Sequence, residues 1–393
     1  MKWSPQQDAA LLKFKRWWDA GKEGNLFHIF GFAGTGKTTL AIELATSIGG
    51  NVAYAAYTGK AASVMRSKDC HGSTTIHQLI YTTQQQSKLR LVELERKKME
   101  ATEPEEVERL EAEIKKEREN LLRPSFTLNE DSRAKKVDLI IIDEVSMVDE
   151  RVGRDLMSFN VPILVLGDPA QLPPVKGSGF FMTGEPEVTL TEVHRTALDN
   201  PVLHLATRIR EGGVIAIGDY GESRVISRAK LEQGASLEYD QVIVGRNRTR
   251  VGANMSIRSQ LGFEGDIPQV QDKLICLKNN HQLGIMNGTL YRVLEAQQDS
   301  GYEILMRLES EDNNAEVEVE AYPQPFKGEE VPRWSFEGLE EFAYGYAVTC
   351  HKAQGSEWPN VFIVDESNVF RSDARKWLYT AITRASNKVM VVR

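Results

Sequence analysis

The chain has 393 residues, of which 41% are hydrophobic and 26% charged, as in a folded globular protein large enough for two or more domains. A net charge of −8 excludes binding of nucleic acid through a generally basic surface, so any such contact is confined to a local groove. The three cysteines are widely spaced and no apolar run nears the roughly 20 residues of a membrane span, so we expect a cytoplasmic protein without metal clusters, disulfides or membrane anchor.

The first part of the chain alternates between helix and strand patterns. An amphipathic helix is predicted for residues 6–20. Short apolar strands are predicted at 25–30 and 51–57, each followed by a helix, and further strands at 137–147 and within 161–175. Strands that alternate with helices predict an α/β fold whose parallel sheet is covered on both faces.

Residues 84–123 interrupt this alternation with a long stretch of charges of both signs. Val107, Leu110, Ile114 and Leu121 recur at heptad-like spacing within it. We predict an antiparallel helical hairpin inserted into the first domain. A single solvated helix that only connects its neighbours is the alternative.

A second α/β unit begins near residue 200, with a helix pattern at 200–213 and a strand with its exit loop at 239–250. Residues 272–322 differ, because short alternating runs are separated by Asn-Gly, Asp-Ser-Gly and Asn-Asn turns. This pattern predicts a small antiparallel barrel. Residues 342–365 then return to strand, loop and strand.

The stretch GFAGTGKT, residues 31–38, matches the phosphate-binding pattern G-x-x-x-x-G-K-[ST] in full. Its glycines let backbone N–H groups surround phosphate oxygens, and the helix that follows directs its positive dipole end toward them. Lys37 supplies a charge for the outer phosphates, and Thr38 a hydroxyl ligand for Mg²⁺. The other nucleotide contacts in this loop are expected from Gly34, Thr35, Gly36 and Thr39.

Two carboxylates stand at the end of the apolar strand in IIIDEVS. Asp143 is suited to hold Mg²⁺ through water, and Glu144 to orient and polarise an attacking water, so the pair indicates a hydrolase rather than a small-molecule kinase. Gln171 follows the next buried strand, beside the rigid pair Pro173-Pro174, and we expect it to reach the γ-phosphate. An ordinary loop amide is the alternative for Gln171.

Eight stretches together resemble a known family. GFAGTGKTT, AYTGKAA, TTIHQL, IIIDEVSM, GDPAQLPPV, EVHRT, YGYAVTCHKAQGSEW and YTAITRA occur in the order found in superfamily 1 helicases, most similar to the 1B branch of RecD and phage Dda type. The resemblance implies two RecA-like parallel-sheet motor domains, with the helical hairpin inserted in the first and a small SH3-like β-barrel in the second. The expected domains are 1–83 with 124–197 (motor 1A), 84–123 (hairpin 1B), 198–265 with 336–393 (motor 2A), and 266–335 (SH3-like 2B).

The resemblance also assigns nucleotide contacts. Gln7 matches the glutamine that recognises adenine, Arg195 an arginine that reaches the γ-phosphate, and Arg384 the arginine supplied by the second motor domain. A planar, permanently charged group suits the charge spread over phosphate oxygens. Because Arg384 lies in the other domain, ATP is expected to control domain separation. A surface ion pair is the alternative for either arginine. Glu357 matches a position near the ribose.

A nucleic-acid track is implied as well. Hydroxyls, amides and backbone N–H groups grip phosphates without adding charge, and Tyr57 offers a stacking face where the family commonly has proline. Local capping or packing is the alternative for each residue. The implied residues are Tyr57, Thr58, Lys60, Thr75 and His77 in the first domain, and Asn247, Thr349, His351 and Lys352 in the second.

We therefore predict an ATP-dependent DNA helicase that uses ATP and Mg²⁺, moves 5′→3′ on single-stranded DNA and unwinds duplex. The direction comes from the resemblance alone. Expected partners are single-stranded DNA, duplex junctions, and single-strand-binding or replication and recombination proteins, without a membrane. The expected processes are DNA replication, repair and recombination. The alternatives are an RNA translocase, a motor that strips proteins, and a nucleotide-switched binding subunit of a larger complex.

Overall fold

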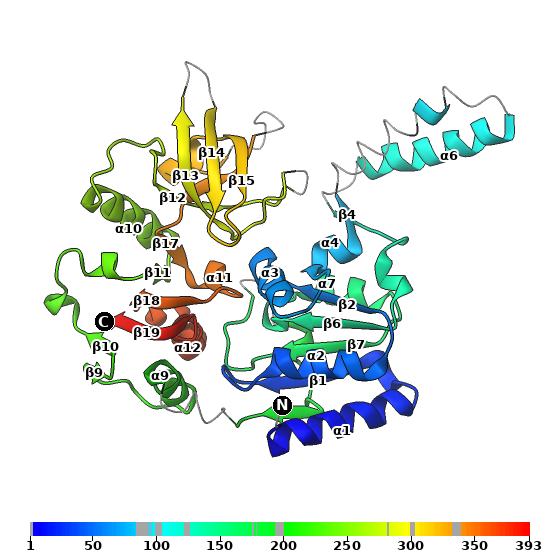
Figure 1. The fold of residues 1–393 in the computed structure, drawn as a ribbon, viewed down its shortest axis with the longest axis horizontal. Coiled ribbons are helices and arrows are strands. Elements are labelled where there is room, and N and C mark those ends of the chain that lie inside the picture. Colours follow the sequence, from blue (N-terminus) through cyan, green and yellow to red (C-terminus); the bar gives the residue numbers. More distant parts are fainter. Residues whose placement is uncertain are drawn as a thin grey trace.

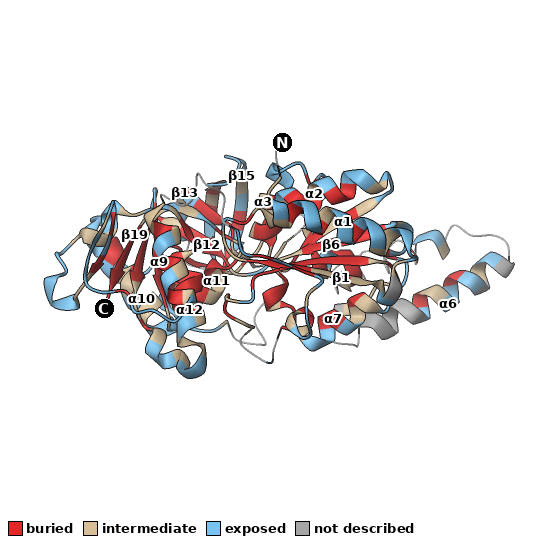
Figure 2. Ribbon diagram, turned by 90° about the horizontal axis from the view of Figure 1, so that it is seen from below, coloured by how far each residue is buried: buried red, intermediate tan, exposed pale blue. Residues whose placement is uncertain are grey.

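The computed structural model shows two α/β units side by side, a small β-sheet above the second, and a helix that extends from the first (Figure 1). Figure 2 shows that buried residues follow the strands and exposed residues the outer faces of the helices. The residues that the structure describes are 3–83, 94, 96–98, 104–121, 126–174, 177, 179–192, 200–280, 283–298, 303–331 and 339–393.

Six parallel strands form the first sheet, in the order β3-β2-β6-β7-β1-β8. The apolar sequences of β6 and β7 are buried almost throughout, as expected for central strands of a covered parallel sheet. The strands are β1 (Leu26–Gly31), β2 (Val52–Ala56), β3 (Thr74–Thr75), β6 (Leu139–Asp143), β7 (Ile163–Gly167) and β8 (Val188–Leu190).

Helices cover both faces of the first sheet. Phe14 packs in the core on one side with Ile141, while Leu79 packs on the other with Ile140. Neighbouring residues of β6 serve opposite faces because side chains alternate along a strand. This sheet and its helices form the first α/β unit. The helices are α1 (Pro5–Asp19), α2 (Lys37–Ile48), α3 (Gly59–Ser67), α4 (Ile76–Ile80) and α7 (Glu150–Met157).

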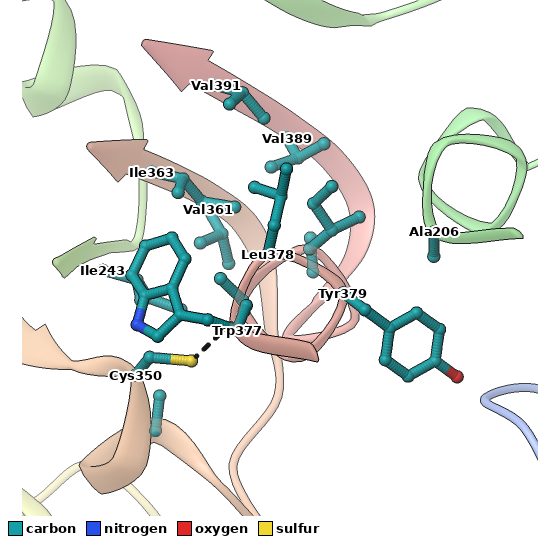
Figure 3. Packing of buried hydrophobic residues seen from close by; sticks show 14 of the residues in the cluster. Ala206, Ile243, Cys350, Val361, Ile363, Trp377, Leu378, Tyr379, Val389 and Val391 are labelled. Carbon is teal, nitrogen blue, oxygen red and sulfur yellow. Dashed lines mark hydrogen bonds between the residues drawn. The ribbon is translucent and has the colours of Figure 1, made fainter. Parts of the chain in front are cut away.

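The second sheet has the order β17-β11-β18-β19-β10-β9 and is parallel except for the edge pair β9–β10. Trp377 and Leu378 pack against Val361 and Val391 on one face (Figure 3). Ile257 packs on the other face. This sheet and its helices form the second α/β unit. Its elements are β9 (Gly218–Tyr220), β10 (Ser223–Ile226), β11 (Gln241–Val244), β17 (Ala347–Thr349), β18 (Trp358–Val364), β19 (Ala385–Val392), α9 (Pro201–Arg210), α10 (Asn247–Gln260), α11 (Cys350–Ala353) and α12 (Ala374–Ile382).

The loop after β11 is shorter than the sequence predicts, because α10 already begins at Asn247. Glu366, far along the chain, accepts hydrogen bonds from the backbone N–H groups of Gly245 and Arg246 at 2.8 and 3.0 Å. A tertiary contact thus satisfies donors at the strand–helix junction, which the local sequence does not reveal.

Five antiparallel strands form the third sheet, in the order β15-β14-β13-β12-β16. Leu274, Val293 and Phe342 lie in its core. Strand β16 falls in the segment predicted to belong to the second motor domain, yet it pairs with β12 of the third sheet. The SH3-like identity of this sheet stays a prediction. The strands are β12 (Lys273–Cys276), β13 (Leu290–Gln297), β14 (Ile304–Ser310), β15 (Glu316–Ala321) and β16 (Phe342–Tyr344).

Helix α6 (Pro104–Leu121) extends away from the first α/β unit (Figure 1). At its base, β4 (Tyr81–Thr83) and β5 (Phe126–Leu128) form an antiparallel pair. Leu94 packs with Leu110 and Ile114 of α6. Much of residues 84–103 and 122–125 lies outside the described residues, so the antiparallel hairpin stays a prediction. Among the described helices, none is both long and apolar enough to cross a membrane.

Candidate active site

The glycine-rich loop connects β1 to α2 at the edge of the first sheet that faces the second α/β unit. Gly34 and Gly36 both have φ of 77°, a left-handed conformation that glycine adopts without steric cost. A Cβ on Gly31 would lie 2.7 Å from Thr35 Oγ1 and 2.9 Å from Leu190 Cβ, so no side chain fits there. The loop therefore presents its backbone at the start of a helix of 12 residues, where anions bind favourably.

Side chains of the loop face the end of β6. Thr38 Oγ1 donates a hydrogen bond to Asp143 Oδ2 at 2.9 Å. Lys37 Nζ donates to the carbonyl oxygens of Gly31 and Phe32 at 2.7 and 3.1 Å. A hydroxyl beside a carboxylate supplies the oxygen ligands that Mg²⁺ prefers, so this donor set fits a magnesium–nucleotide complex.

Glu144 meets a cation from the second α/β unit. Its φ of 56° is unusual for a residue with a side chain, and its backbone N–H donates to Asp143 Oδ1 at 2.8 Å. Arg384 Nη1 lies 3.9 Å from Glu144 Oε1. Burial raises the pKa of Glu144, and the charge of Arg384 opposes that shift. A carboxylate with a raised pKa is a better general base near neutral pH.

The other residues predicted to contact the nucleotide differ in how close the structure places them to the phosphate-binding loop. Gln7 Nε2 donates to the carbonyl oxygen of Thr35 at 3.1 Å, so Gln7 lies against the loop. Gln171 is 7% exposed, and its Oε1 has no hydrogen-bond partner among the residues that the structure describes. Glu357 is exposed between α11 and β18. Arg195 lies outside the described residues.

Hydroxyls of the predicted nucleic-acid track cap helices. Thr58 Oγ1 accepts from Ala61 N at 3.1 Å at the start of α3, and Thr75 forms a capping box with Gln78 at the start of α4. Both threonines therefore have a structural role in addition to any role in binding. The ring of His77 lies 5.8 Å from that of Tyr57, and burial lowers the pKa of His77.

Two lysines of the track contact the third sheet. Lys60, at the start of α3, forms an ion pair with Asp312 in the connection between β14 and β15. Lys352 of α11 donates to Asn287 Oδ1, and burial lowers its pKa. The start of α3 also lies close to the loop after α11. Gly355 of that loop packs so tightly that a Cβ at this position would lie only 2.7 Å from Thr58 Oγ1.

The remaining residues of the track come from the second α/β unit. Asn247 is exposed at the start of α10, and Thr349 precedes α11, which carries His351 and Lys352. Burial lowers the pKa of His351 as well. Residues of both α/β units thus meet close to the third sheet.

Three residues that connect the two units are not predicted from the sequence. Tyr379 and Thr380 of α12 bond to the loop after β7, and Asp168 in that loop accepts the bond from Tyr379. All three lie within the stretches GDPAQLPPV and YTAITRA, which also contain the predicted site residues Gln171 and Arg384. Their position in those stretches was the available signal.

Comparisons with known proteins agree with this arrangement. Residues 6–230, more than half of the chain, match the AAA domain family, and residues 344–392 match the UvrD-like helicase C-terminal domain. The ATP-dependent RecD2 DNA helicase of Deinococcus radiodurans is 28% identical over 387 residues, which is 91% of this chain but 45% of that protein. The chain thus spans less than half the length of this relative.

Two solved structures share the fold. Bacteroides Pif1 bound to single-stranded DNA has a TM-score of 0.61 and 20% identity, covering 99% of this chain and 92% of that one. Bacteroides Pif1 helicase in complex with ADP-AlF3 and single-stranded DNA has a TM-score of 0.58 and 18% identity over the same shares. These similarities and the parallel sheets fit two RecA-like domains.

A complete phosphate-binding loop, with a strand-end carboxylate at the seam of two parallel sheets, defines a P-loop nucleotide-binding protein. The chain belongs to the AAA domain family, and it is similar to the RecD2 and Pif1 helicases described above.

Proposed function

We propose that this chain is an ATP-dependent DNA helicase that hydrolyses ATP between two RecA-like units and moves 5′→3′ on single-stranded DNA. The observation that carries the proposal is the approach of Arg384, from the second unit, to Glu144 at the nucleotide site of the first. A site completed by both units links hydrolysis to their relative movement. The motor domains would be 1–83 with 124–197 and 198–265 with 336–393.

The residues divide the chemistry among them. Mg²⁺, held by Thr38 and Asp143, would neutralise charge on the phosphate oxygens. Lys37 would turn from the loop carbonyls to the outer phosphates, while Glu144 accepts a proton from the attacking water. Arg384 and Gln171 would stabilise and orient the γ-phosphate. We assign Gln7 to adenine, Arg195 to the γ-phosphate and Glu357 to the ribose.

Single-stranded DNA is the proposed ligand of the track near the third sheet. The Pif1 structures with single-stranded DNA and the relative described as a DNA helicase support this choice. We propose that residues 84–123 form a hairpin that serves as a wedge, a guide for the displaced strand or an arm that binds a partner. We also propose that 266–335 form an SH3-like insertion. Three free, buried cysteines support a cytosolic location.

The deciding experiment is strand displacement on partial duplexes that carry a 5′ or a 3′ single-stranded tail, with ATP and Mg²⁺. We expect product from the 5′-tailed substrate, and product from the 3′-tailed substrate alone would overturn the direction. ATPase stimulation by single-stranded DNA and by RNA of the same sequence separates a DNA motor from an RNA translocase. ATP hydrolysis without any displacement would favour a motor that strips proteins.

A further inference from the structure

We propose that the hydroxyl groups of Tyr379 and Thr380 are positioning groups that couple closure of the two α/β units to ATP hydrolysis. The inference rests on the proposed ATPase function. Both residues lie on α12, the helix that leads to Arg384. They hold the loop that carries Gln171, which belongs to the first unit.

Tyr379 bridges two parts of the first unit. Its hydroxyl donates to Asp168 Oδ2 at 2.7 Å and accepts from the backbone N–H of Ala33 at 3.0 Å. Ala33 belongs to the phosphate-binding loop, and Asp168 follows β7. Figure 3 shows the Tyr379 ring directed away from Trp377 and the strand residues of its own core. A side chain rooted in the second unit thus joins two loops of the first.

Thr380 holds the same loop a few residues further on. Its Oγ1 accepts from the backbone N–H of Leu172 at 2.8 Å. Gln354, also in the second unit, donates through Nε2 to the carbonyl oxygen of Leu172 at 2.8 Å. Both backbone groups of Leu172 are therefore bonded to the second unit, although Leu172 lies in the loop that follows β7 of the first unit.

These contacts connect the two predicted catalytic groups. Gln171 lies between Asp168 and Leu172, which are the two held points of the loop. Arg384 Nε donates to the carbonyl oxygen of Thr380 at 3.2 Å. Thr380 thus fixes the Gln171 loop through its side chain and the Arg384 side chain through its main chain. Movement of α12 displaces both groups together.

Because these groups are buried, their hydrogen bonds form or break together. Tyr379 is 2% exposed, Thr380 0% and Asp168 3%. A buried carboxylate that loses its donor carries a desolvation cost, so partly opened arrangements are unfavourable. The bonds form together when the units are closed and break together when they separate. Gln171 is then held beside the γ-phosphate site only in the closed arrangement.

The test compares Tyr379→Phe and Thr380→Val, which remove the hydroxyls with little change of shape, with matched controls. Tyr346→Phe is the first control, because the Tyr346 hydroxyl makes the same kinds of bond away from the nucleotide site. It donates to the carboxylate of Asp272 and accepts from the backbone N–H of Lys273. Thr380→Ser keeps the hydroxyl. Steady-state ATPase with single-stranded DNA gives kcat and KM, binding of a fluorescent hydrolysis-resistant ATP analogue gives Kd, and thermal unfolding gives Tm.

We expect kcat to fall about tenfold for Tyr379→Phe and about threefold or more for Thr380→Val, from the worth of a charged and a neutral hydrogen bond. Analogue Kd should stay within twofold of wild type. Tyr346→Phe and Thr380→Ser should keep wild-type kcat. In the double variant Tyr379→Phe with Asp168→Ala, the fall in kcat should be smaller than the product of the two single losses, because the two side chains share one contact.

An unchanged kcat in Tyr379→Phe would overturn the coupling. So would an equal loss in Tyr346→Phe with an equal fall of Tm, because the effect would then be general destabilisation. Additive losses in the double variant would overturn the route through Asp168. A wild-type protein without DNA-stimulated ATPase would instead overturn the proposed function, so the two failures are distinguishable.

Discussion

The guanidinium group of Arg384 lies 3.9 Å from the carboxylate of Glu144, although the two residues belong to different α/β units. Both side chains are largely shielded from solvent, with 7% and 20% of their area exposed. Charges in such surroundings interact more strongly than on an open surface. The protonation state of Glu144 therefore depends on how closely the second α/β unit approaches.

Glu144→Gln should separate binding from hydrolysis. The amide has the shape of the carboxylate but cannot accept a proton, so ATP affinity should stay within twofold while turnover falls by at least about 100-fold. Equilibrium binding and steady-state ATPase measure the two effects. Glu150→Gln, at an exposed carboxylate nearby, is the control and should keep its activity. Normal turnover in Glu144→Gln would assign the base to another residue.

The pH dependence of kcat should report the same pair. Burial raises the pKa of Glu144, and the base is active only when deprotonated, so kcat should rise with pH through a midpoint above the ordinary glutamate value. Arg384→Ala removes the charge that opposes the shift, so its midpoint should move to higher pH. Arg384→Lys keeps the charge and should move it less. A midpoint in Arg384→Ala at or below the wild-type value would contradict this interaction.

Lys37→Ala should abolish hydrolysis without unfolding the protein. Lys37 Nζ bonds only to loop carbonyls among the described residues, so its removal leaves no buried charge unpaired. We expect ATPase to fall by at least about 100-fold, because a preorganised charge at the phosphates is lost. Lys13→Ala is matched, since Lys13 Nζ likewise donates to a carbonyl, that of Glu187. Activity in Lys37→Ala equal to that of Lys13→Ala would remove Lys37 from the site.

The local elements of the fold could be predicted from sequence because their signals are local. The apolar runs that form β1, β6 and β7 end in glycine or a polar residue, and the spacing of the phosphate-binding loop is specific. The predicted strand 137–147 nevertheless extended too far. Val145 and Val148 are fully buried in a turn after Asp143, and an apolar pattern does not distinguish a buried turn from a strand.

Contacts between distant segments could not be predicted in the same way. Tyr379 and Asp168 are 211 positions apart, and neither has a periodicity that indicates the other. Strand β16 is buried throughout, so its sequence does not show which of two sheets it joins. The pairing of Lys60 with Asp312 depends on how the third sheet is placed over α3. These features depend on tertiary arrangement, which a single sequence encodes only indirectly.

The ion pair between Lys60 and Asp312 gives opposite predictions for its two partners. If Lys60 contacts a DNA phosphate, Lys60→Ala should weaken binding of single-stranded DNA and lower the salt slope by about 1. Asp312→Ala should free the lysine and tighten binding severalfold. Fluorescence anisotropy of a labelled oligonucleotide over a salt series measures both.

Glu318→Ala controls for the change in net charge, because it removes an exposed carboxylate from β15 of the same sheet. Tightening in Asp312→Ala beyond that of Glu318→Ala assigns the effect to the released lysine. Weaker binding in both Lys60→Ala and Asp312→Ala would instead show that the pair only holds α3 against the third sheet.

A buried ion pair attaches the third sheet to α10. Arg258 and Asp272 are 1% and 0% exposed, and Arg258 Nη2 donates to Asp272 Oδ2 at 2.9 Å. Arg258→Ala leaves a buried carboxylate without its counter-charge and should lower the free energy of unfolding by about 3–5 kcal/mol. Urea unfolding followed by tryptophan fluorescence measures the loss. Arg224→Ala breaks a pair with Asp219 at the same distance, but with 55% and 72% exposure, and should cost under about 1 kcal/mol. Equal losses in the two variants would show that burial adds nothing to the worth of this pair, and that the attachment of the third sheet depends on its apolar core instead.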